Sequence, residues 1–105
     1  MEFAEHNLEE MYGRTAKVES SPVACTVLPF NLMRPGQARA RRELNVWIEA
    51  EAREKSIPFV DTAAAVCRKG EPDRLEGTPD GLHPDVEGYR RMAQAISAVL
   101  QEQPQ

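Results

Sequence analysis

The run Val23-Ala24-Cys25-Thr26-Val27-Leu28 decides the fold, because it is almost continuously apolar and stops at Pro29. A run of this kind suits a strand that is covered on both faces, as the strands of parallel sheets are. A second such run, over residues 57–60, ends at Asp61, and a helical pattern lies between the two. Strands that alternate with helices predict an α/β domain with a parallel sheet.

Helical periodicity supplies the remaining elements. Residues 37–55 carry an inward stripe of Ala40, Leu44, Trp47 and Ile48, at the spacing of one helix face. The predicted order is a helix over 3–17, a strand over 23–28, a helix over 37–55, a strand over 57–60, a short helix over 63–67, a long loop over 69–84 and a helix that begins after Asp85. Because two strands make no self-sufficient sheet, we expect the 23–28 strand to have an unpaired apolar edge.

The two terminal helices show stripes of their own. The first is predicted to pack through Phe3, Leu8, Met11, Tyr12 and Ala16, and the last through Val86, Tyr89, Ala93, Ile96 and Leu100. Asp85 is a suitable N-cap for the last helix. The polar tail over 101–105 is expected to fray.

Composition limits the possible classes of function. The chain has 105 residues, 41% apolar and 29% charged, with a net charge of −4, which is typical of one soluble globular domain. A nucleic-acid partner is not expected, since Arg39, Arg41 and Arg42 are followed by acidic residues and predict a solvated helix face rather than a basic stripe. No apolar run suits a membrane span and no signal peptide is visible, so we expect a cytoplasmic protein without membrane contact.

Cysteine usage gives no support for a metal site. Cys25 and Cys67 lie in apolar contexts without CxxC spacing, so both are predicted to be reduced structural residues, with Cys25 pointing from mid-strand into the core. We expect no metal and no cofactor.

The strongest chemical signal is Asp80-Gly81-Leu82-His83-Pro84, directly before the last helix. An Asp three residues before a His can accept a hydrogen bond from the imidazole Nδ1–H, which leaves Nε2 free as a base and stabilises the imidazolium. The spacing alone leaves open a second interpretation, a surface histidine in a turn that Asp80 forms. Asp80 and His83 are therefore the candidate catalytic residues.

The segment from Asp80 to Tyr89 resembles the last block of SGNH (GDSL) hydrolases, in which a DxxHP loop is followed by a helix with a Gly-Tyr pair near its start. Weaker matches follow in the family's order over about residues 5–100: Asn7-Leu8, Val23 to Pro29, Leu44-Asn45 and Phe59-Val60-Asp61. The resemblance implies a partial three-layer α/β/α, flavodoxin-like fold with a short parallel sheet. It also implies that residues 1–105 form a single incomplete domain.

The resemblance further implies ester (acyl) hydrolysis, with Asp80 and His83 as two members of a Ser-His-Asp triad. The family's nucleophile lies in a Gly-Asp-Ser segment, and part of its oxyanion hole lies in a Gly-x-Asn-Asp segment. Neither segment occurs in this sequence. We therefore expect the chain to be inactive alone, and to act on an ester or acyl small molecule only if the serine is supplied from elsewhere.

No other side chain is predicted to replace the serine. The residues considered are Ser20, Ser21, Ser56, Ser97, Thr62, Cys25 and Cys67. Active sites of open parallel sheets lie at the carboxyl ends of the strands, whereas the first three serines precede strands and Ser97 lies far along the last helix. Thr62 is at the correct edge but has no activating neighbour. His6 is expected to be solvated, without a role.

Two other interpretations of function stay open. The chain could be a non-catalytic module that forms a homo-oligomer through the exposed edge of the 23–28 strand. It could also be a fragment of a longer gene product without separate biology. The sequence does not identify the substrate, the oligomeric state or a second chain that carries the serine.

Overall fold

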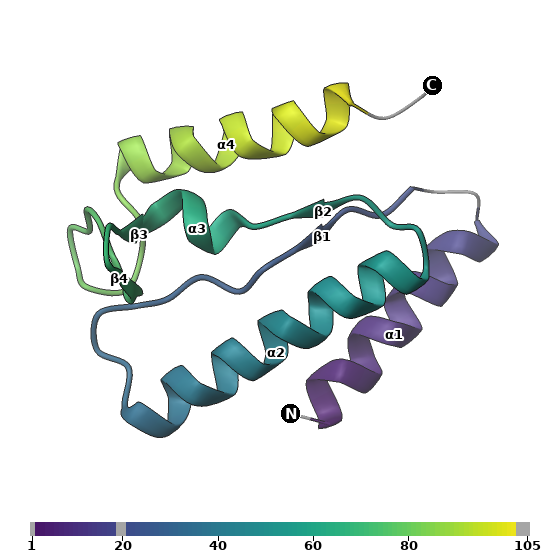
Figure 1. Ribbon diagram of the computed structural model, residues 1–105, viewed down its shortest axis with the longest axis horizontal. Coiled ribbons are helices and arrows are strands. Elements are labelled where there is room, and N and C mark those ends of the chain that lie inside the picture. The colour runs from purple at the N-terminus through teal and green to yellow at the C-terminus, as the bar shows by residue number, and fades with distance from the viewer. Residues whose placement is uncertain (1, 19–20, 103–105) are drawn as a thin grey trace.

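Helices flank a two-stranded parallel sheet in the computed structural model, which describes residues 2–18 and 21–102. The elements are α1 (Glu2–Lys17), β1 (Ala24–Cys25), α2 (Pro35–Glu54), β2 (Phe59–Val60), α3 (Thr62–Val66), β3 (Cys67–Arg68), β4 (Glu71–Leu75) and α4 (Val86–Gln101). Figure 1 shows three layers, with α1 and α2 on one side of β1 and β2 and with α4 on the other. The α/β fold class is thereby confirmed. Ser20 and residues 103–105 lie outside the described residues.

The parallel sheet is shorter than the sequence predicts. β1 pairs with β2 through Ala24 and Cys25 alone. The backbone N–H of Ala24 donates to Pro58 O at 2.9 Å, and that of Thr26 donates to Val60 O at 3.2 Å. The pairing stops there because β2 ends at Val60 and Asp61 begins the next helix as its N-cap.

The core lies between α1, α2 and the sheet. Tyr12, Ala24, Ile48 and Ala52 are buried together. Around them pack five partly buried side chains, Leu8, Leu44, Trp47, Ile57 and Phe59. The predicted stripe of α2 is therefore largely confirmed. In α1 the stripe is confirmed at Tyr12, whereas Phe3 and Met11 are exposed.

Arg41 corrects the prediction of a solvated arginine face on α2. Its side chain is only 8% exposed and forms an ion pair with Asp73 at 2.9 Å. Its guanidinium also donates to Val27 O at 3.0 Å and to Pro72 O at 3.1 Å. Arg42, on the same helix, forms an ion pair with the other carboxylate oxygen of Asp73. The cluster ties α2 to β4.

The predicted 69–84 loop is also wrong in part, because β3 and β4 form an antiparallel hairpin. Gly70 sits in its turn at φ +80°, a conformation that glycine adopts without steric cost. No apolar strand pattern marks this stretch of the sequence, because β4, Glu-Pro-Asp-Arg-Leu, buries only its last residue, Leu75.

A third correction concerns Cys25, which is exposed rather than core-facing.

The last helix begins at the predicted N-cap. The Asp85 carboxylate accepts a hydrogen bond from Gly88 N at 2.8 Å. The predicted inward stripe is wrong in its position, because Val86, Tyr89 and Leu100 are at least half exposed. Within residues 2–18 and 21–102, no helix combines the length and the apolarity that crossing a lipid bilayer requires.

Candidate active site

Asp80 and His83 are joined by a short hydrogen bond. His83 Nδ1 lies 2.7 Å from Asp80 Oδ2. If Nδ1 carries the proton, this contact holds the imidazole in the tautomer whose Nε2 is a free base. The structure thus brings together the two candidate catalytic residues in the geometry that an acid–base pair requires.

The Asp80 carboxylate also organises the backbone of its own loop. Its Oδ1 accepts hydrogen bonds from Leu82 N at 2.9 Å and from His83 N at 2.8 Å. The hydrogen bond with the His83 side chain, followed by these two backbone bonds, holds the pKa of Asp80 well below its usual range. Asp80 is therefore an anion throughout the physiological range, and it can stabilise a positive charge on the imidazole.

Neighbouring residues fix the path of this loop. The Thr78 hydroxyl accepts from Gly81 N at 2.9 Å. Gly81 has φ +79°, which a residue with a side chain would adopt only under strain. Its carbonyl accepts from Asn31 N at 2.7 Å. Asn31 follows β1, so this bond positions the Asp80–His83 loop beside the carboxyl end of the parallel strands, where active sites of such sheets lie.

Close packing holds the loop against the start of α4. A Cβ on Gly77 would lie 2.1 Å from Asp85 Oδ2, and one on Gly88 would lie 2.8 Å from Pro84 Cβ. The backbone N–H of Asp85 donates to Gly77 O at 3.1 Å. The two glycines therefore allow a close approach that holds the loop carrying His83 against the start of α4.

Asn31 is a positioning residue that the sequence analysis missed. Its side-chain Oδ1 accepts from Leu75 N at 2.8 Å, while its own N–H binds the Asp80–His83 loop. It therefore connects β4, the segment after β1 and the acid–base pair. A polar residue shortly after a buried strand was the only available signal.

The pair is open to solvent. The side chains are 46% exposed at Asp80 and 66% exposed at His83. Within residues 2–18 and 21–102, no hydrogen bond joins His83 to a serine, threonine or cysteine side chain. The arrangement can hold and move a proton at Nε2, and it presents that nitrogen to water.

The other candidates lie in structural roles or at the surface. Thr62 is 1% exposed, and its hydroxyl donates to Thr26 O at 2.8 Å. Cys67 Sγ contacts Ala64 O at 3.7 Å. His6 is 77% exposed on α1. In the described parts of the chain, no cluster of three His, Cys, Asp or Glu side chains suits a metal ion.

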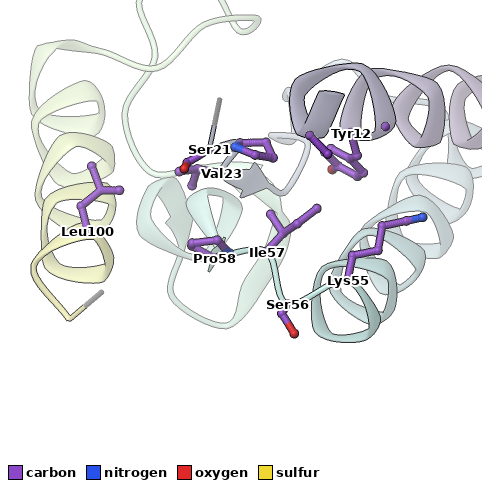
Figure 2. Close-up of a pocket in the computed structure, with 11 residues that line it drawn as sticks. Tyr12, Ser21, Val23, Lys55, Ser56, Ile57, Pro58 and Leu100 are labelled. Atoms are coloured by element: carbon purple, nitrogen blue, oxygen red, sulfur yellow. The ribbon is translucent and has the colours of Figure 1, made fainter. Parts of the chain in front are cut away.

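A hollow of about 720 Å³ lies away from the acid–base pair. Figure 2 shows it between the ends of α1, α2 and α4, lined by residues that include Tyr12, Val23, Ile57 and Leu100. It opens at the amino-terminal end of the parallel strands, whereas His83 lies at their carboxyl end. The hollow and His83 therefore lie at opposite ends of the sheet.

The fold and the pair define a class. A parallel sheet between helical layers, with a hydrogen-bonded Asp–His pair just before the last helix, defines a three-layer α/β/α domain. The chain belongs to the GDSL-like lipase/acylhydrolase family, whose sequence profile matches residues 1–91. No curated protein matches the chain.

Solved structures support this assignment. A GDSL-like lipase from Bacteroides thetaiotaomicron is 27% identical over 97% of this chain, with a TM-score of 0.82. The fold also matches a protein of the G-D-S-L family from Desulfitobacterium hafniense, at 24% identity over 93% of the chain and a TM-score of 0.77. An esterase domain of a zebrafish retrotransposon ORF1 protein matches at 18% identity over 95% of the chain and a TM-score of 0.74.

The chain spans only part of each of these relatives. It covers 53% of the Bacteroides protein, 54% of the Desulfitobacterium protein and 62% of the zebrafish domain. Between 38% and 47% of the length of each of these three relatives therefore has no counterpart in these 105 residues.

Proposed function

We propose that the chain provides the acid–base half of a Ser-His-Asp triad for the hydrolysis of ester or acyl substrates. The observation that carries the proposal is the 2.7 Å contact between His83 Nδ1 and Asp80 Oδ2. Membership of the GDSL-like lipase/acylhydrolase family supplies the class of reaction.

In this reaction a serine hydroxyl attacks the acyl carbonyl while His83 Nε2 takes its proton. The imidazolium then returns the proton to the leaving alcohol, and a water molecule, deprotonated in the same way, releases the acid. Asp80 keeps its negative charge throughout, and through Nδ1–H it fixes the orientation of the ring and stabilises the imidazolium.

We also propose that the chain is inactive alone. The sequence contains neither the Gly-Asp-Ser nor the Gly-x-Asn-Asp segment, so a nucleophile and oxyanion donors must come from elsewhere. Each oxyanion donor is worth about 10²–10³-fold in rate. The contacts of His83 support the same proposal, because among the described residues its ring is hydrogen-bonded to Asp80 and to no serine hydroxyl.

The test is a chimera with the Bacteroides thetaiotaomicron lipase, in which this chain replaces the segment that it matches. We expect the chimera to hydrolyse p-nitrophenyl esters, and His83→Ala to lower kcat by about 10³-fold or more. His6→Ala is the matched control, since it removes the other histidine, which is exposed on α1. The 105-residue chain should show no turnover above buffer and no fluorophosphonate adduct. Equal kcat for the chimera with and without His83 would refute the proposed role.

A further inference from the structure

A hollow of about 380 Å³ lies between the first turns of α2, β4 and the segment that connects β1 to α2. We call it the α2–β4 pocket. Three arginines line it, Arg39 and Arg42 from α2 and Arg74 from β4, and Asp73 is the one acidic side chain among its described lining residues. Three positive charges and one negative charge leave +2 on the lining, in a chain whose net charge is −4. The positive charge is therefore concentrated around a cavity of the size that small ligands occupy, about 300–1,000 Å³.

The single carboxylate of the α2–β4 pocket is already shared by two arginines. Asp73 Oδ1 accepts a hydrogen bond from Arg41 at 2.9 Å, and Asp73 Oδ2 accepts one from Arg42. Arg41 is buried, with 8% of its side chain exposed, and it does not itself line the pocket. Asp73 carries one negative charge against these two positive charges. It therefore has no charge left to compensate the remaining arginines of the pocket.

Arg39 and Arg74 are the remaining arginines, and each keeps donors to spare. Among the described residues, Arg39 forms no ion pair. Arg74 has one long contact, 4.0 Å from its Nε to Glu71 Oε1, while the other oxygen of Glu71 lies 3.2 Å from Arg68. A guanidinium presents several N–H donors in one plane, which match the paired oxygens of a carboxylate or a phosphate. Two such groups beside one cavity form the donor set of an anion site.

The position of the arginines in α2 opposes the charge of the helix itself. Residues 35–42, Pro-Gly-Gln-Ala-Arg-Ala-Arg-Arg, contain three arginines and no acidic side chain. The N-terminal end of a helix carries a partial positive charge, so cations there are unfavourable and anions are favourable. Sequences break local rules of this kind mainly at functional sites. An anion in the α2–β4 pocket would offset the part of this cost that Asp73 leaves.

The α2–β4 pocket adjoins the Asp80–His83 loop. Asn31 lines the pocket, and its backbone N–H donates to Gly81 O at 2.7 Å. The next side chain, Leu32, lies close to Gly81, since a Cβ at that glycine would be 3.8 Å from Leu32 Cγ. The segment after β1 therefore both lines the pocket and contacts the loop that carries the acid–base pair.

We propose that the α2–β4 pocket is an anion-binding subsite, and that the ester substrate of the Asp80–His83 pair carries a carboxylate or phosphate group that Arg39 and Arg74 bind. Phe30 and Met33, which also line the pocket, contact the carbon chain between that group and the ester. The inference rests on the proposed function for the reaction, and it adds the charge of the substrate.

The first experiment measures binding to the 105-residue chain without any reaction. Monomethyl adipate and inorganic phosphate are titrated separately at low ionic strength, while ¹H–¹⁵N spectra follow the arginine Nε–H signals. We expect saturable shifts at Arg39 and Arg74. Dimethyl adipate, in which the carboxylate is esterified, should cause no such shifts. The anion that binds more tightly identifies the group as a carboxylate or a phosphate.

Matched variants test the two arginines. Arg39→Gln and Arg74→Gln each remove one positive charge and should weaken anion binding by about tenfold or more. Arg39→Lys keeps the charge and should give an affinity between those of the wild type and Arg39→Gln. The control is Arg53→Gln, which removes the same charge at the other end of α2, where the side chain is 77% exposed and pairs with Glu49. It should leave binding unchanged, and circular dichroism reports the folding of each variant.

The second experiment uses the chimera that tests the proposed function. Mono-p-nitrophenyl adipate and p-nitrophenyl hexanoate have acyl chains of equal length, and the first ends in a carboxylate. We expect kcat/KM of the chimera to be higher for the charged ester by about tenfold or more. Arg39→Gln and Arg74→Gln should bring the ratio of the two values toward one, whereas Arg53→Gln should leave it unchanged. The comparison of the two esters by the unsubstituted chimera does not depend on the folding of any variant.

The inference and the proposed function fail in different ways. Equal shifts with monomethyl and dimethyl adipate, no binding of either anion, or equal affinities of Arg39→Gln and Arg53→Gln would each overturn the inference. A chimera that hydrolyses the neutral ester as well as the charged one would also overturn it and would leave the proposed function standing. A chimera that hydrolyses neither ester, while the 105-residue chain binds an anion at Arg39 and Arg74, would support the anion site and refute the proposed function.

Discussion

Arg41 should be the most important charged residue for stability, and Arg41→Ala tests this. The guanidinium makes three hydrogen bonds, to Val27 O, Pro72 O and Asp73 Oδ1. Breaking a fully buried ion pair costs about 3–5 kcal/mol. The cost here is smaller, because the loss leaves no buried acceptor unpaired. Asn45 still binds Val27 O, Arg42 still binds Asp73, and water reaches the exposed Pro72.

The wild-type arginine also carries a penalty that the variant removes. Its Nε is buried without a hydrogen-bond partner, which costs about 1–3 kcal/mol. The loss of three hydrogen bonds from a charged donor, each worth about 1.5–3 kcal/mol, is offset by this penalty and by the remaining partners of Val27 O and Asp73. We therefore expect Arg41→Ala to cost on the order of 2 kcal/mol, which is less than the cost of breaking a fully buried ion pair.

Urea unfolding, followed by the fluorescence of Trp47, measures this loss. Trp47 is the single tryptophan and packs against the core. With a slope of about 1–1.5 kcal/mol per molar urea for a small protein, the midpoint should fall by about 1.5 M. Arg42→Ala is the control, since its side chain is 50% exposed and a surface ion pair is worth about 0–1 kcal/mol. If Arg41→Ala were no more destabilising than Arg42→Ala, the assignment of Arg41 as the clamp between α2 and β4 would be wrong.

Further predictions concern the loop and its helix. Gly88→Ala should destabilise the chain, because the new Cβ would meet Pro84 Cβ at 2.8 Å. Gly13→Ala meets open space and should stabilise α1 by about 0.5–1 kcal/mol. The two variants should therefore shift the thermal unfolding midpoint in opposite directions, and shifts of the same sign would contradict the prediction. Asp85→Ala removes the N-cap bond to Gly88 and should cost about 1 kcal/mol, a loss that thermal unfolding detects and that an unchanged midpoint would exclude. Because the pKa of Asp80 is lowered, the stability that its carboxylate contributes is present at neutral pH and is lost only as the pH falls through that low pKa. The ¹³C chemical shift of the Asp80 carboxyl should therefore show no titration between pH 7 and about pH 4. A titration midpoint at the ordinary aspartate value would refute the hydrogen-bonded geometry.

The acid–base loop could be predicted from the sequence because its contacts are local. The bonds of Asp80 all go to residues within three positions, and the N-cap bond of Asp85 spans the same separation. Short-range patterns of this kind can be recognised in a single sequence. The role of Asn31 could not be predicted, since its side chain binds Leu75, 44 positions away.

Burial that depends on distant partners could not be predicted. The sequence predicts that Arg41 is solvated, because its acceptor, Asp73, lies 32 positions further along the chain. The hairpin was hidden for a related reason: β4 is polar along most of its length, so no period-two apolar pattern marks it. In α4 the sequence shows apolar residues on two faces, and periodicity alone does not tell which of them meets this chain.

Local order in the Asp80–His83 loop bears on how a partner would act. Oδ1 of Asp80 is already bonded to Leu82 N and His83 N, Oδ2 to the imidazole, and Gly81 O to Asn31 N. All of these hydrogen bonds form within this chain and need no further strand. Completion of the site in the chimera would therefore leave the Nδ1–Asp80 contact unchanged and would exclude water from Nε2, which strengthens every electrostatic interaction around it. An imidazole ¹⁵N spectrum should accordingly show the same Nδ1–H tautomer for the 105-residue chain and for the chimera. A tautomer that appears only in the chimera would mean that the added residues, rather than the loop, orient His83.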